Sequence, residues 1–136
     1  RPDSAAPINV HWGVDNRSCG FRVPISDRHN RRVENRLPGA DSNPYLAIAA
    51  SLVCGYIGMI ERMLPPKEIE GSAYNRARTL PRTLEAALDR FAACKKVKQL
   101  LGEDFFDIFF AVKDQELYNY QSVVSSWERE HLLLRV

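Results

Sequence analysis

The first part of the chain alternates short apolar stretches with polar turns, which is the pattern of β-strands. The predicted strands cover residues 8–14, 19–23 and 32–37. The turn-forming pair at 15–16 and the polar segment 26–30 separate them. Since strands joined by connections this short usually pair as hairpins, we expect an antiparallel meander.

A strongly apolar segment follows and predicts a helix that continues to Leu64. Asn43 is a good N-cap, and Pro44 suits the first helical position, where no backbone donor is needed. The apolar residues behind them lie on nearly every side of the helix, and the prolines at 65–66 end it. Because a helix that is apolar all round is normally buried, we expect this helix to pack against the sheet.

Two further helices are predicted from apolar positions at helical spacing. Thr83 caps the first of them, and the second continues through Tyr120 toward Trp127. The charged segment 65–82 before them is expected to be a surface loop. Stripes at this spacing usually face a core; they comprise Leu84, Leu88, Phe91 and Ala92 in one helix and Phe105, Ile108, Phe109 and Val112 in the other.

Length and composition fit one domain with a core of its own. The chain has 136 residues, of which 45% are hydrophobic and 26% are charged. The expected fold class is α+β, with an antiparallel sheet segment in residues 1–38 and packed helices in residues 43–136. Because the chain opens with Arg1 and not with methionine, we expect it to be the end of a longer protein.

Charge and cysteine content exclude several classes of protein. A net charge of +2 is too balanced for binding nucleic acid through bulk electrostatics. Three cysteines without a C-x-x-C pair fit neither a disulfide scaffold nor a zinc site. No apolar run reaches the ~20 residues that span a bilayer. We therefore expect reduced thiols, a cytoplasmic location, and neither nucleic acid nor a membrane as a partner.

Arginine dominates the basic residues and concentrates near the start of the chain. Fourteen of the nineteen basic residues are arginine, and residues 1–36 hold seven arginines and no lysine against four acidic residues. Codon bias explains scattered arginines. A local cluster, however, is typical of sites that bind phosphate or carboxylate, because the guanidinium group makes bidentate contacts with both.

Three charged residues alternate along the third predicted strand. Arg32, Glu34 and Arg36 project from one face, about 6.7 Å apart in succession. This pattern fits a solvated ladder of ion pairs. It also fits an anion and metal site, in which the flanking guanidinium groups keep the glutamate ionised, as a metal ligand must be.

Two more arginines lie in and before the second predicted strand. Arg17 and Arg22 are five residues apart, which places them on opposite faces of a regular strand. Both reach one site only if Gly20 forms a bulge or if the strand begins after Ser18. Four arginines and one carboxylate would then converge, which calls for an anionic ligand such as phosphates with a divalent cation.

Other candidate chemistry is weaker. The three histidines lack the spacing of metal ligands, and Cys19 is expected to be a packing residue. A module that binds anions or nucleic acid would need aromatic residues on the arginine face, and only Trp12 and Phe21 are near. Tyr74, in its charged loop, is a candidate contact or modification site, although most tyrosines in such loops are neither.

The motifs resemble the C-terminal part of the catalytic domain of glutamine synthetases. The resemblance rests on the runs NRS at 16–18, FRVP at 21–24 and RRVENRLPGADSNPYLA at 31–47. It extends through the helices to Val124, Trp127, Glu128 and Arg129 and covers almost the whole chain. The motif is long and specific.

The resemblance implies an ATP-dependent ligase that phosphorylates the γ-carboxylate of glutamate and then lets an amine displace the phosphate. It implies that Arg17 and Arg22 hold the ATP phosphates and the transferring group as catalytic residues, and that Arg32 also binds ATP. It implies Glu34 as a ligand of Mg²⁺ or Mn²⁺ and Arg36 as the binding residue for glutamate. It also implies a homo-oligomer of stacked rings, with further metal ligands upstream of residue 1.

One departure from the family pattern concerns the amine. Ammonia-using members carry an acidic residue where this chain has Ala5. The resemblance, strengthened by the pattern at 39–44 and the ending at 124–130, therefore favours the branch that glutamylates polyamines or other alkylamines. Glutamine synthesis from ammonia, or a non-catalytic relative with the same fold, are the alternatives.

Overall fold

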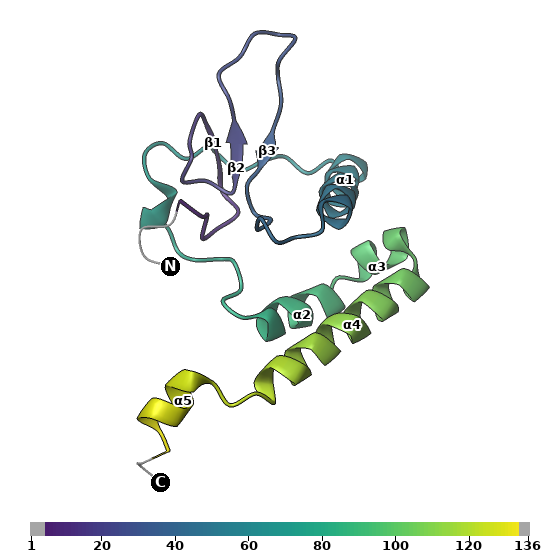
Figure 1. Cartoon of the computed structure of the whole chain (residues 1–136). Coiled ribbons are helices and arrows are strands. Elements are labelled where there is room, and N and C mark those ends of the chain that lie inside the picture. The colour runs from purple at the N-terminus through teal and green to yellow at the C-terminus, as the bar shows by residue number, and fades with distance from the viewer. Residues whose placement is uncertain (1–4, 134–136) are drawn as a thin grey trace. The chain divides into compact units, whose positions relative to one another are not determined.

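The computed structural model describes residues 5–133, and the chain divides into two compact units, Arg1–Leu80 and Pro81–Val136. Figure 1 shows strands and one long helix in the first unit and only helices in the second. The α+β class predicted from the sequence is confirmed.

The first unit contains a three-stranded sheet in the order β1-β2-β3, formed by β1 (Trp12–Val14), β2 (Phe21–Val23) and β3 (Glu34–Asn35). Strands β2 and β3 are antiparallel, as predicted, but β1 and β2 are parallel. The expected antiparallel meander is therefore wrong for the first pair of strands.

The shortness of the strands explains the parallel pairing. Parallel neighbours usually need a long crossover because the chain must return along the whole strand. A three-residue strand is only ~10 Å long, so the six-residue connection 15–20 is enough. Asp15 begins this return with a φ of 47°, a left-handed conformation that Asp tolerates, and its N–H donates to the carbonyl of Val23 at 2.9 Å.

Helix α1 (Pro44–Ile60) begins where the sequence predicts. The side-chain oxygen of Asn43 accepts hydrogen bonds from the N–H groups of Tyr45 and Leu46 at 3.0 and 3.3 Å. The helix ends four residues before the predicted Leu64. The amide of Asn35 in β3 donates to the hydroxyl of Ser51 at 2.9 Å, which joins sheet and helix.

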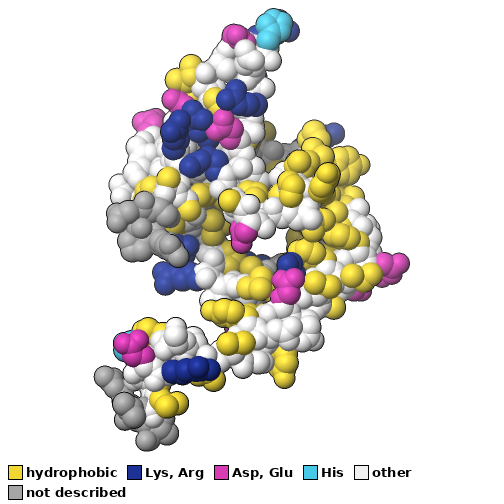
Figure 2. All heavy atoms as spheres, viewed as in Figure 1, with side chains coloured by type: hydrophobic (Ala, Val, Ile, Leu, Met, Phe, Trp, Pro, Cys, Tyr) yellow, Lys and Arg dark blue, Asp and Glu magenta, His cyan; other side chains and the backbone are white. Residues whose placement is uncertain are grey.

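The prediction that α1 is buried against the sheet is wrong. None of its residues is buried, and Figure 2 shows hydrophobic side chains over its surface. Tyr45 is 82% exposed and Met59 72% exposed. A 17-residue helix is ~25 Å long, and three strands of two or three residues are too small to cover it.

The predicted surface loop, residues 65–82, is mostly exposed. Backbone hydrogen bonds nevertheless tie it to the start of the chain, from Ile69 N–H to the Trp12 carbonyl at 2.9 Å and from Thr79 N–H to the Ile8 carbonyl at 3.1 Å. It contains the short 3-10 helix η1 (Ala73–Asn75), whose first residue is fully buried.

The second unit contains helices α2 (Leu84–Ala92), α3 (Lys95–Leu101), α4 (Glu103–Gln121) and α5 (Ser126–His131). Thr83 caps α2 as predicted, through a hydrogen bond from the Ala86 N–H at 3.2 Å. Among the described residues, none of the helices is long and apolar enough to cross a membrane.

The long helix predicted to run toward Trp127 is two helices. Helix α4 ends at Gln121, and Ser125 and Glu128 form a reciprocal capping box that starts α5. The predicted core stripe is also corrected: Phe106 is buried and stacks on Phe91 at a ring-centroid distance of 4.0 Å, whereas Ile108 and Val112 are at least half exposed.

Replacing Asn43 with Ala should lower the free energy of unfolding of the first unit by about 1 kcal/mol, because the side-chain acceptor for the N–H groups of α1 is lost. Asn43→Asp keeps an acceptor at the same place and should lose only a few tenths of that amount. Urea unfolding followed by circular dichroism measures both variants. Equal losses in the two would contradict the capping role.

Candidate active site

A carboxylate held by two arginines lies at the centre of the sheet's charged face. Arg22 in β2 and Glu34 in β3 are paired in register, and Nη1 of Arg22 donates to Oε2 of Glu34 at 2.7 Å. Nη2 of Arg32 donates to Oε1 at 3.2 Å. Figure 2 shows basic and acidic side chains gathered over the strands. Both carboxylate oxygens of Glu34 therefore contact a guanidinium group, but the second one belongs to Arg22 and not to Arg36, which the alternating pattern predicts.

Arg22 has a second acidic partner that the sequence reasoning missed. Its Nε donates to Oδ1 of Asp15 at 3.1 Å, and its Nη2 contacts the same oxygen. The sequence pattern indicates Asp15 only as a turn former. The parallel pairing puts Val14 opposite Val23, so the residue after β1 lies beside the end of β2. Nothing in the sequence pattern indicates that pairing, which is why the contact could not be foreseen.

The arginines keep Glu34 ionised. The hydrogen bond from Arg22 is the main reason that the pKa of Glu34 lies below its usual value, and the charges of Arg22 and Arg32 lower it further. The pKa of Arg22 is raised, first by Glu34 and then by Asp15. Both groups are therefore charged throughout the neutral pH range.

Glu34 has the chemistry of one metal ligand, since ionised carboxylate oxygens are the donors that Mg²⁺ and Mn²⁺ prefer. Within residues 5–133, however, no group of three or more His, Cys, Asp or Glu residues is placed to hold a metal ion. Among the described residues, Glu34 could therefore supply one ligand of a divalent ion, and a complete site would need further ligands.

Arg36 is held by backbone carbonyl groups. Its Nη2 donates to the carbonyl of Ala5 at 3.0 Å, and its Nη1 donates to the carbonyls of Cys19, at 3.2 Å, and of Arg17. These three acceptors carry no formal charge. The guanidinium group is therefore fixed in place without a carboxylate in these contacts.

Arg17 lies in the connection before β2. Strand β2 begins at Phe21, so the condition that it starts after Ser18 is met. Arg17 lies outside the strand, and the alternation of side chains along a strand therefore does not place it on the face opposite to Arg22. Among the described residues, its guanidinium group makes no hydrogen bond or ion pair. It lines a cavity of about 500 Å³ together with Asp15, Glu68 and Glu70.

The predicted site residues thus fall into two groups. Arg22, Arg32 and Glu34 form one hydrogen-bonded cluster, and Arg36 contacts the backbone of Arg17 in the neighbouring turn. No contact of the described residues joins the guanidinium groups of Arg17 and Arg22 to one another. Their convergence on one ligand stays a prediction.

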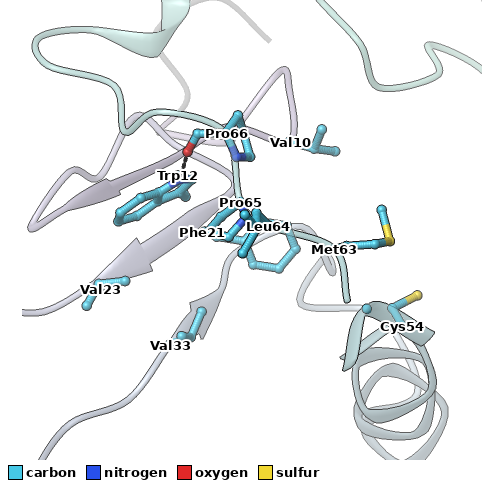
Figure 3. A pocket seen from close by; sticks show the side chains of 11 residues that line it. Val10, Trp12, Phe21, Val23, Val33, Cys54, Met63, Leu64, Pro65 and Pro66 are labelled. Carbon is cyan, nitrogen blue, oxygen red and sulfur yellow. Dashed lines mark hydrogen bonds between the residues drawn. The ribbon is translucent and has the colours of Figure 1, made fainter. Parts of the chain in front are cut away.

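The opposite side of the strands is apolar. Phe21 and Val23 flank Arg22 in β2, and with Val33 they line a cavity of about 560 Å³ shown in Figure 3. Trp12 closes part of it and donates its indole N–H to the Pro66 carbonyl at 2.7 Å. Cys19, two residues before Phe21, is fully buried, which confirms the packing role expected for it. Burial also raises the pKa of its thiol.

A comparison with protein families identifies the chain. The family described as "Glutamine synthetase, catalytic domain" matches residues 1–132. The chain belongs to this family, as the motifs around Arg17, Arg22 and Glu34 indicate.

Its relatives differ in the amine that they are named for. The chain is 34% identical to gamma-glutamylputrescine synthetase of Escherichia coli over 98% of its own length and 28% of that protein. It is 37% identical to glutamate–isopropylamine ligase of a Pseudomonas species, over 88% of the chain and 27% of the relative. It is 32% identical to glutamine synthetase of Thermus thermophilus, over 97% and 32%. The chain therefore spans less than a third of the length of these relatives.

Glu34 should make the stability of the first unit depend on pH. A carboxylate whose pKa is lowered by folding stabilises the fold above its unfolded pKa of about 4.3, and this stabilisation is lost as the pH falls through the lower folded value. The gap in unfolding free energy between wild type and Glu34→Gln should be constant near neutral pH and shrink in acid.

Urea unfolding of wild type, Glu34→Gln and the control Glu130→Gln, which removes an exposed carboxylate of the second unit, measures this gap at each pH. A gap for Glu34→Gln that stays the same down to a pH of about 2 would show that Arg22 and Arg32 do not stabilise the ionised form.

Proposed function

We propose that the complete protein containing this chain is an ATP-dependent ligase that joins an amine to the γ-carboxylate of glutamate. Membership of the glutamine synthetase family supports this activity. The observation that carries it is the cluster of Arg22, Arg32 and Glu34, which places fixed positive charge around one ionised carboxylate. Such an arrangement suits phosphoryl transfer, which is catalysed by positioning and charge stabilisation and not by a protein nucleophile.

The proposed reaction has two steps. An oxygen of the glutamate γ-carboxylate attacks the terminal phosphorus of ATP, the bond to the bridging oxygen breaks, and ADP leaves. The amine nitrogen then attacks the acyl carbon of γ-glutamyl phosphate, loses a proton, and releases inorganic phosphate. Arg17, Arg22 and Arg32 are proposed to bind the phosphate oxygens in the first step.

The contacts of Arg22 suit it to bind phosphate oxygens. A guanidinium group carries five N–H donors, and Arg22 uses three of them on Asp15 and Glu34. The two remaining donors are available to phosphate oxygens, while the two carboxylates fix the orientation of the group. Orientation fixed before binding reduces the entropy lost when the ligand binds.

Glu34 is proposed to contribute one carboxylate oxygen to a Mg²⁺ or Mn²⁺ ion. Such an ion neutralises phosphate charge and orients the triphosphate. Because both oxygens of Glu34 contact arginines, the carboxylate is ionised and held in one orientation. The cluster is thus consistent with a ligand supplied by this chain and others supplied by the rest of the protein.

The amine is proposed to be an alkylamine or a polyamine. Ala5 stands where ammonia-using members have an acidic residue, and its carbonyl accepts a hydrogen bond from Arg36, the proposed glutamate-binding residue, at 3.0 Å. Ala5 therefore lies beside the residue that is proposed to bind glutamate, the acceptor of the phosphoryl group. Two of the relatives are named for alkylamine or diamine substrates, which supports the same proposal.

Glutamine synthesis from ammonia is the second candidate. The Thermus thermophilus relative carries that name at similar identity, so identity alone does not choose between the two.

We also propose that the complete protein assembles as a homo-oligomer of stacked rings, in keeping with the family that the motifs resemble.

ADP release by the complete protein, measured with glutamate and a panel of amines, should be faster with alkylamines or diamines than with ammonium, because the position of Ala5 offers a small cation no carboxylate. An Ala5→Asp variant is the matched test of this reason and should shift the preference toward ammonium. Equal or faster turnover of the wild type with ammonium would refute the amine assignment.

Arg36→Lys should raise KM for glutamate by roughly tenfold, because an ammonium group cannot reproduce a bidentate contact with a carboxylate. KM for ATP should change little. Steady-state kinetics of the complete protein measure both constants, with Arg28→Lys, an exposed arginine in the turn between β2 and β3, as the control. A rise confined to KM for ATP would contradict the assignment of Arg36.

A further inference from the structure

The side chain of Asn16 is saturated with hydrogen bonds. Its amide nitrogen donates to the carbonyls of Ile69, at 3.2 Å, and Gly71, at 2.7 Å. Its amide oxygen accepts from the N–H of Ser18 at 3.0 Å and from the Ser18 hydroxyl at 2.6 Å. A side-chain amide offers two donors and two acceptor sites, and all four are used here.

Ser18 extends this network into the buried part of the unit. Its hydroxyl donates to Asn16 and accepts from the N–H of Ala73 at 2.8 Å. Ala73 is fully buried, and its carbonyl accepts from the amide of Asn9 at 2.8 Å. The residues on either side of Arg17 are thus joined to segment 69–73, more than fifty positions further along the chain.

The two segments also approach closely. A Cβ atom added at Gly13 would lie 2.9 Å from Cβ of Asn16 and 3.0 Å from the carbonyl oxygen of Ile69, so a larger residue would have to push one of them away. Gly71 has a φ of 76°, which glycine adopts without strain. Both glycines allow the backbone of 69–71 to reach the amide of Asn16.

Arg17 itself takes no part in these contacts. Its guanidinium group makes no hydrogen bond or ion pair among the described residues, although both neighbouring side chains are fixed. The network therefore holds the backbone on each side of Arg17 and leaves its side chain available to a ligand.

We propose that Asn16 and Ser18 are positioning residues that, with segment 69–73 as their support, hold Arg17 ready to bind a phosphate group. This inference rests on the proposed function, in which Arg17 binds ATP. A purely structural role for the network would lower stability and leave the affinity of the folded protein for ATP unchanged. A positioning role instead acts on ATP affinity through Arg17.

The test uses the complete protein with steady-state kinetics and calorimetric titration of Mg-ATP. Ser18→Ala should raise KM and Kd for ATP by roughly fivefold to tenfold, because the hydroxyl that links Asn16 to Ala73 is lost. KM for glutamate should change less than about twofold. Ser18→Thr keeps the hydroxyl and should restore the wild-type values.

Asn16→Asp tests the other half of the network. It retains an acceptor for Ser18 but places a carboxylate oxygen against the carbonyls of Ile69 and Gly71, so hydrogen exchange of 69–73 should accelerate and Kd for ATP should rise. Ser72→Ala is the matched control on the same segment, because it removes only a local hydrogen bond to Tyr74. It should leave Kd for ATP unchanged.

A double-mutant cycle separates the possible outcomes. In an Arg17→Ala background, Ser18→Ala should have no further effect on Kd for ATP, because it acts through Arg17. If Arg17→Ala alone leaves ATP binding unchanged, the assignment of Arg17 under the proposed function fails. If Arg17→Ala weakens binding but folded Ser18→Ala and Asn16→Asp do not, or if the effects are additive, the positioning role is overturned and the proposed function stands.

Discussion

The hydrogen-bonded ion pair between Arg22 and Glu34 is the contact on which the charged face depends. It joins β2 to β3 across the sheet, and it brings Asp15 from one side and Arg32 from the other into the same cluster. Each charge is offset by a neighbour of opposite sign. A high density of arginine is therefore compatible with a folded sheet, and the carboxylate that holds it together is kept in the ionised form that a metal ligand needs.

The side chains on the two faces of β2 have different surroundings. Arg22 belongs to the charged cluster, whereas its neighbours Phe21 and Val23 line the apolar cavity. The period of two in an extended strand produces this division directly from the sequence. It is also the reason that a segment of only three residues can both line an apolar cavity and place a charged group in the cluster.

Local patterns in the sequence were sufficient for part of the structure. The alternation of Arg32, Glu34 and Arg36 predicted the contact between Arg32 and Glu34, although not the contacts of Arg36 with backbone carbonyl groups. The caps at Asn43 and Thr83 predicted the starts of α1 and α2. These features depend on neighbours only a few residues away.

Features that depend on distant residues were not predictable in the same way. The parallel pairing of β1 and β2, and with it the contact between Asp15 and Arg22, follows from how short the strands are. The exposure of α1 follows from the small area of the sheet that faces it. One local signal was also missed: Ser125 and Glu128, only three residues apart, form the capping box that starts a new helix where the apolar spacing predicted a continuous one.

Long-range hydrogen bonds give the turn around Arg17 one more property. Its contacts with residues 69–73 require closure of a loop of more than fifty residues, which includes the whole of α1. The helices of the second unit, by contrast, form from local contacts. On refolding, helical structure should accumulate before this turn acquires its native conformation.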